Sequence, residues 1–251
     1  MRFDEFARTL GQAFASAMTE SGNFRFSGDA PGSVTLDELD LTGPAPTGLK
    51  VSLSRKDNVR VVQGDVFAVT VAGDDTAAEM LRFKGDEEVL KVIRRHGTGG
   101  PLEIIVTVPA LSSVSIAGAG RITADKLSGD ARVAIGGSGN VCVDTFEGER
   151  LTARIGGSGR IVMAGHVGSL DLAIGGSGNF DAEHLEVEEA SIRIGGSGSV
   201  EIASDGEIKA KIGGSGDILV HGNARCSLKA SGSGKFRNVP RGKTGPMDEA
   251  A

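Results

Sequence analysis

The phrase IGGSG occurs five times in the second half of the chain, and glycine-rich loops of this kind bind calcium or phosphate in other proteins. A calcium-binding G-G-x-G-x-D repeat needs aspartate as its sixth residue, but here that residue is apolar, as in GGSGNV. A phosphate loop needs G-x-x-x-x-G-K-[ST] followed by a helix, and neither occurs at these glycines. We therefore expect no metal and no cofactor there, and we interpret the glycines as corners where positive φ is tolerated.

Asp181 and Glu201 are the two carboxylates with a spacing that favours catalysis. They occupy the same position in successive repeats, so on neighbouring strands they would lie about 5 Å apart, as in the carboxylate pairs of glycosidases. The chain has no Trp or Tyr to line sugar subsites, and the equivalent residues of the flanking repeats are Val162 and Leu219. We expect two solvated carboxylates and no enzyme. A polysaccharide lyase or hydrolase that uses this pair is the alternative.

The histidines and cysteines show no pattern of metal or disulfide chemistry. No ligand spacing such as H-x-x-x-H connects the four histidines His96, His166, His184 and His221. Cys142 falls at an outward position and Cys226 at an inward one about four strands away, roughly 19 Å, which is too far for a disulfide. We therefore predict no metal site, two free thiols, and a place for Cys226 in the core.

A partly basic row precedes the corners. It contains Arg154, Arg193, Lys211 and Lys229, with Lys209 two residues before Lys211. Charged side chains on a solvated strand face that resists edge pairing would explain this row. The alternative hypothesis is a surface that binds an acidic partner, either an anionic polysaccharide or a protein.

Composition excludes several classes of function. The chain has 251 residues, of which 39 are Gly and 39% are hydrophobic, and its net charge is −6. The hydrophobic fraction is sufficient for a core, whereas the negative charge argues against a nucleic-acid partner. No apolar run is long enough for a transmembrane helix, and acidic residues at the start of the chain leave no visible signal peptide.

The first part of the chain predicts a helix followed by strands. An apolar stripe at steps of three and four residues predicts a helix over residues 2–19, within a segment 1–22 that could cap one end of the fold. The stripe consists of Phe3, Phe6, Leu10, Phe14 and Met18. Residues 23–113 alternate as strands do, Ser33–Leu41 among them.

Residues 114–240 form a repeat with a period of 18–20 residues, and we expect residues 241–251 to be a flexible tail. Such a period indicates a solenoid, and one coil is too short to hold a helix as well as its strands. Apolar residues alternate on both sides of each glycine corner, which predicts two short strands per coil with every second side chain in a core. The fold class is therefore all-β: a single-stranded parallel β-helix.

The phrase PLEIIVTVPALSSVSIAGAGRI and the IGGSG units after it resemble the auto-transporter adhesin head family, also called the GIN domain. The resemblance covers roughly residues 48–238. It implies a right-handed parallel β-helix, no established catalytic activity, and a family usually exported from bacteria to the periplasm or cell surface. The leading hypothesis is thus a non-catalytic β-solenoid scaffold or adhesin-like module that binds a polymer or protein. A self-associating structural protein, a homo-oligomer built end to end, is a further alternative.

Overall fold

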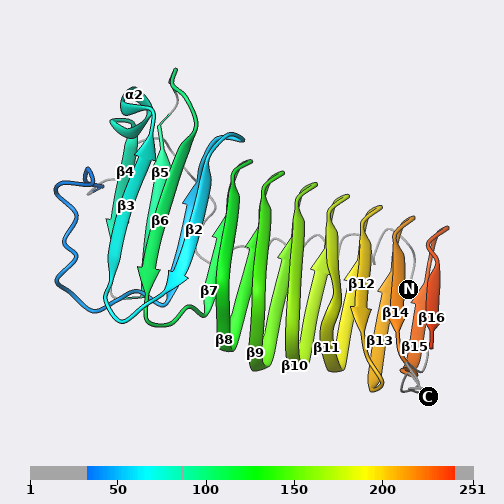
Figure 1. Ribbon diagram of the computed structural model, residues 1–251. Coiled ribbons are helices and arrows are strands. Elements are labelled where there is room, and N and C mark those ends of the chain that lie inside the picture. Colours follow the sequence, from blue (N-terminus) through cyan, green and yellow to red (C-terminus); the bar gives the residue numbers. More distant parts are fainter. Residues whose placement is uncertain (1–32, 86–87, 96, 241–251) are drawn as a thin grey trace, which may run out of the picture.

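The computed structural model describes residues 33–240 apart from 86–87 and 96. Its strands stack one after another along a single axis to give an elongated solenoid (Figure 1). The helix expected over residues 2–19, its role as a cap and the tail 241–251 lie outside the described residues. Among the described residues, no helix is long and apolar enough to cross a membrane.

The first part of the fold combines parallel and antiparallel pairing. Its elements are β1 (Gly48–Ser52), β2 (Asn58–Gln63), β3 (Ala68–Gly73), α2 (Asp75–Ala78), β4 (Leu81–Gly85), β5 (Val89–Arg94) and β6 (Leu102–Val108). Strand β1 pairs in parallel with β5, and β2 with β6, whereas β3–β6 and β4–β5 are antiparallel. The strictly parallel β-helix expected from the sequence therefore does not extend through this part of the chain.

The strand expected at Ser33–Leu41 does not form. Only Val34 makes a bridge, to Phe83, and the chain then turns, because the backbone N–H and hydroxyl of Thr35 both donate to the carboxylate of Glu38 at 3.0 Å. The alternating apolar residues of this segment serve another purpose. Leu36 and Leu39 are partly buried against the core, so the segment packs against the first part of the solenoid.

The repeats form the parallel coils that the sequence predicts. Their strands are β7 (Ser113–Ile116), β8 (Arg121–Ile135), β9 (Asn140–Ile155), β10 (Arg160–Ile174), β11 (Asn179–Ile194), β12 (Ser199–Ala203), β13 (Glu207–Ile212), β14 (Asp217–His221), β15 (Arg225–Ala230) and β16 (Phe236–Val239). Each coil pairs in parallel and in register with the next, so equivalent residues form columns along the axis. In the longest strands a bulge breaks the ladder once per coil.

The inward columns predicted from the sequence are buried. The corner isoleucines Ile155, Ile174 and Ile194 have no exposed surface, and neither do Ile161 and Phe180 in the column that follows the corner. Burial of such a side chain contributes about 1.5–3 kcal/mol. The repeated columns therefore supply most of the driving force that holds the coils together.

The corner glycines are required by close approach between coils, so the expected reason, positive φ, is wrong for most of them. Gly157, Gly176 and Gly196 have ordinary φ values. A Cβ on Gly176 would lie 2.3 Å from the carbonyl oxygen of Gly157, and one on Gly196 would lie 2.1 Å from that of Gly176. The serine between each pair of glycines continues the ladder, since the N–H of Ser177 donates to Gly157 O at 3.0 Å.

The last coil exposes its interior, which contradicts the core position expected for Cys226. Cys226 does pair with buried Ile208 in the inward column, yet it is exposed, and Leu228 in the same column is 43% exposed. The reason is its place in the stack: among the described residues, β15 pairs only with β13 and no further coil covers it. Both thiols are free, as predicted.

Candidate functional site

The outward face of the second strand in each coil carries two adjacent columns of polar residues. We call the first the cationic column: it runs Lys91, Lys50, Ser115, Ala134, Arg154, Ala173, Arg193, Lys211, Lys229. The second runs Gly48, Ser113, Arg132, Thr152, Asp171, Ser191, Lys209, Ser227. Strand alternation places both columns on the solvent side, and successive members lie about 4.8 Å apart.

The structure thus places the five predicted surface residues Arg154, Arg193, Lys209, Lys211 and Lys229 on one face, in two neighbouring columns. It also extends the row. Lys50 and Lys91 pair in register and join the same column, although they come from the part of the chain without repeats. Burial lowers the pKa of Lys50, and the nearby Lys91 ammonium lowers it further.

The positive charge in the middle of this face is partly compensated. Asp171 lies between two arginines: its Oδ2 is 2.7 Å from Arg154 Nη2 and its Oδ1 is 3.0 Å from Arg193 Nη1. Lys209 pairs with Glu207 at 2.9 Å, and the Glu207 carboxylate raises the pKa of that lysine. Within the part of the chain that the structure describes, the side chains of Lys211 and Lys229 have no ion-pair partner.

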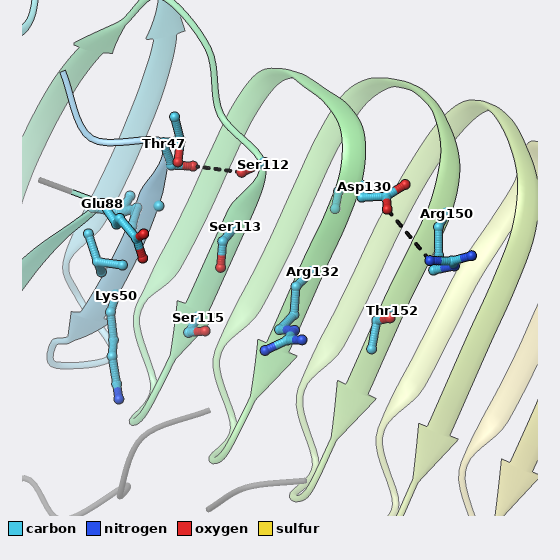
Figure 2. A pocket seen from close by; sticks show the side chains of 14 residues that line it. Thr47, Lys50, Glu88, Ser112, Ser113, Ser115, Asp130, Arg132, Arg150 and Thr152 are labelled. Carbon is cyan, nitrogen blue, oxygen red and sulfur yellow. Dashed lines mark hydrogen bonds and ion pairs between the residues drawn. The ribbon is translucent and has the colours of Figure 1, made fainter. Parts of the chain in front are cut away.

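A groove of about 570 Å³ lies at the first part of this face (Figure 2). It is lined by the long side chains of Glu88, Arg132 and Arg150 together with small residues such as Gly48 and Ser113. Gly48 of β1 and the serines of β7 stand beside the arginines of β8 and β9, and this difference in length contributes to the hollow. Gly48 allows close packing, since a Cβ there would lie 3.1 Å from Val89 Cγ2.

Hydroxyl and guanidinium groups dominate the chemistry of the groove. Figure 2 shows Arg132 between Ser113 and Ser115 on one side and Thr152 on the other. Arg150 makes a distant ion pair with Asp130, at 3.6 Å, and both side chains are about two-thirds exposed. The Arg132 side chain has no hydrogen-bond or ion-pair partner among the described residues. Its guanidinium therefore offers donors in a fork suited to a carboxylate, sulfate or phosphate.

Sequence reasoning missed this groove. Ser113 and Lys50 precede the repeats, and only the register between β1, β7 and β8 brings them beside Arg132. The available signal was the alternation itself: Ser113 and Ser115 alternate with apolar residues in SVSI, and Arg132 stands between Ala131 and Val133, which identifies all three polar residues as outward.

The carboxylate pair considered for catalysis lies on the other outward face. Asp181 and Glu201 pair directly across β11 and β12, as their spacing predicts. Each has its own partner: Asp181 Oδ2 is 2.5 Å from Arg160 Nη1, and Glu201 Oε1 is 2.7 Å from His221 Nε2. Asp181 is thus held by a guanidinium and Glu201 by an imidazole.

The fold and its polar faces define a β-solenoid of a type seen in several bacterial proteins. The chain belongs to the family described as "Putative auto-transporter adhesin, head GIN domain", whose model matches residues 49–224. No curated protein matches the chain.

Three solved structures share the fold. A putative adhesin from Bacteroides fragilis is 20% identical with a TM-score of 0.71, covering 84% of this chain and 98% of its own. A putative adhesin from Parabacteroides merdae is 21% identical with a TM-score of 0.61, covering 82% and 94%. A putative lipid binding protein from Parabacteroides distasonis is 19% identical with a TM-score of 0.60, covering 79% and 94%.

Proposed function

We propose that this protein is a non-catalytic, adhesin-like binding module that holds an anionic polysaccharide against the groove and the cationic column. The observation that carries the proposal is Arg132, whose guanidinium has no partner among the described residues and lies among the hydroxyls of Ser113, Ser115 and Thr152 in a groove of about 570 Å³. Hydroxyl groups match the hydroxyls of a sugar, and a guanidinium matches its carboxylate or sulfate. Membership of the adhesin head family supports a binding role.

The length of the cationic column favours a polymer over a small ligand. Seven steps of about 4.8 Å separate Lys50 from Lys229, a span of roughly 34 Å. Contact is expected mainly at the two ends, at the groove and at Lys211 with Lys229, because Arg154 and Arg193 in between already pair with Asp171. Several weak contacts along one chain add up through effective concentration.

Charge reversal in the groove is the first test. We expect Arg132→Glu to weaken binding of polygalacturonate about tenfold, because the substitution replaces an attractive charge by a repulsive one. Lys211→Glu with Lys229→Glu should have a similar effect, whereas Arg154→Glu should have a smaller one. These affinities are measured by titration at fixed ionic strength, with calorimetry or interferometry as the readout.

Arg121→Glu is the matched control, since Arg121 lies on the same strand β8, in its first half before the bulge, and the change in net charge is the same. Dextran serves as the neutral polymer. Equal binding of polygalacturonate by the wild type, Arg132→Glu and Arg121→Glu would contradict the proposal.

The alternative of a carbohydrate-active enzyme is tested on the same incubations with assays for reducing ends and unsaturated products. Turnover that is lost on replacing Asp181 and Glu201 would establish the enzyme instead of the binding module.

End-to-end association is a second candidate function, and the last coil, which no other described strand covers, favours it. Leu228 is 43% exposed and Val239 is 44% exposed, next to the outer edges of β15 and β16. Apolar side chains beside unpaired strand edges form a template on which another strand can pair. We propose that a second copy of the chain occupies this end.

Leu228→Lys is expected to shift the protein toward monomer at concentrations where the wild type is dimeric, because the charge opposes burial of this end. Light scattering measures the mass, and Val66→Lys is the control, since Val66 is 73% exposed in the loop between β2 and β3. Oxidation should also cross-link two copies through Cys226. A wild type that stays monomeric would overturn the proposal. Association that appears only after deletion of residues 1–20 would indicate instead that this segment of the same chain covers the last coil.

A further inference from the structure

Three side chains from three successive coils converge on the outward face opposite the groove's face. They are Glu183 of β11, Glu201 of β12 and His221 of β14, and their ligand atoms all lie within 4.8 Å of one another. His221 Nε2 is 2.7 Å from Glu201 Oε1, and these two side chains are only 30% and 35% exposed. The imidazole and one carboxylate are therefore held in place, with a second carboxylate beside them.

The stacking of the coils explains why these residues meet. Glu201 and His221 lie on the neighbouring strands β12 and β14, where Glu201 pairs with Leu219 and Ala203 pairs with His221. On β11 the register shifts after Ala182, so that Glu186 lies opposite Ala203 and Glu183 falls in the irregular part of the strand. The side chain of Ala203 is only a methyl group, which leaves space beside it for the longer side chains of Glu201 and His221.

We propose that Glu183, Glu201 and His221 form a binding site for a divalent transition-metal ion of the zinc type. An imidazole nitrogen with carboxylate oxygens is a usual zinc ligand set, with metal–ligand distances of about 2.0–2.2 Å. Ligand atoms within 4.8 Å of one another can reach one such ion after small rotamer changes. The two carboxylates balance the charge of the ion, and the imidazole favours zinc over calcium or magnesium.

The arrangement differs from the other histidine–carboxylate pairs of the protein. His166 lies 3.3 Å from Glu188, but among the described residues no third ligand group stands beside that pair. Glu183 is also contacted by His184, at 3.4 Å, so a fourth candidate ligand adjoins the site. Three protein ligands would leave a coordination position open to water or to a carboxylate of a partner.

Spacing along the chain hides this site, which is why no metal was expected from the sequence. Glu183 and Glu201 are 18 residues apart, and Glu201 and His221 are 20 apart, which are the lengths of single coils. A metal motif within one helix or loop would use spacings of two to five residues. In a solenoid the coil length is the spacing that brings side chains together.

Zinc titration of the tag-free full chain tests the proposal, in a Cys142→Ser/Cys226→Ser background that removes the two thiols as competing ligands. We expect one Zn²⁺ per chain, with a shift of the His221 ring signals in NMR spectra. Glu201→Gln and His221→Ala should each weaken binding more than about tenfold, the loss that follows even removal of an outer-shell partner. His166→Ala, the matched control, should leave the affinity unchanged.

Two results would overturn the site. One is that the Cys142→Ser/Cys226→Ser protein binds no Zn²⁺ at micromolar to millimolar concentrations. The other is binding that Glu201→Gln and His221→Ala leave unchanged, or that His166→Ala weakens as much as they do. Because neither Glu201 nor His221 lies on the face of the groove, polygalacturonate binding should persist in both variants, so the metal site and the proposed glycan surface can fail separately.

Discussion

Replacing Arg94 by methionine is expected to lower the free energy of unfolding by about 3–5 kcal/mol, the usual cost of removing one partner from a buried ion pair. Arg94 Nη1 lies 2.5 Å from Asp57 Oδ1, and the two side chains are 6% and 0% exposed. The backbone N–H groups of Ser54 and Leu102 also donate to this carboxylate, at 2.9 and 3.1 Å. Without the guanidinium, a buried negative charge would remain with two neutral donors.

Amide hydrogen exchange of Leu102 measures this effect locally, and denaturant unfolding followed by circular dichroism measures it globally. A local probe is needed because the coils of a solenoid can unfold in parts, so one global transition is not assured. Arg60→Met is the matched control: Arg60 lies 3.8 Å from Asp125 in a surface pair, for which a loss below about 1 kcal/mol is expected. Equal effects of the two substitutions would contradict the assigned role of the Asp57–Arg94 pair.

The repeat region could be predicted in detail because each of its columns is sampled several times. Ile155, Ile174 and Ile194 occupy one position of the coil, so their common burial follows from the period alone. Parallel stacking then follows, since equivalent strands of successive coils run in the same direction. The glycine corners were located correctly for the same reason, although their physical cause is close approach and not backbone conformation.

The first part of the fold could not be predicted to the same depth. Period-two alternation is the same for parallel and antiparallel strands, so the antiparallel pairs β3–β6 and β4–β5 leave no trace in the sequence pattern. The groove depends on which strand lies beside β1, and this register places Lys50 beside Ser115 without a repeat to reveal it. Periodicity also fails to say where a stack ends, which is why Cys226 has an inward position and an exposed side chain.

Replacing Gly176 by alanine is expected to cost about 3 kcal/mol, at the upper end of what overpacking usually costs. The added Cβ would lie 2.3 Å from Gly157 O and 3.0 Å from Gly157 C, and both atoms belong to the backbone of the preceding coil. No side-chain rotation can relieve this contact. The coils must separate locally, which stretches the ladder bond from Ser177 N to Gly157 O, now 3.0 Å long.

Gly43→Ala is the control for this substitution, because apart from its two chain neighbours no described residue has an atom within 4 Å of the position of the added Cβ, and the φ angle is not in the left-handed region. A Gly→Ala change at such a site is neutral or stabilises a protein by up to about 1 kcal/mol, through the unfolded chain. Denaturant unfolding of the two variants, with hydrogen exchange of the Ser177 and Ser197 amides, separates a general effect of alanine from contact at the corner. If Gly176→Ala were as stable as Gly43→Ala, the coils would have to tolerate a wider spacing, and close approach would not explain why glycine recurs at every corner.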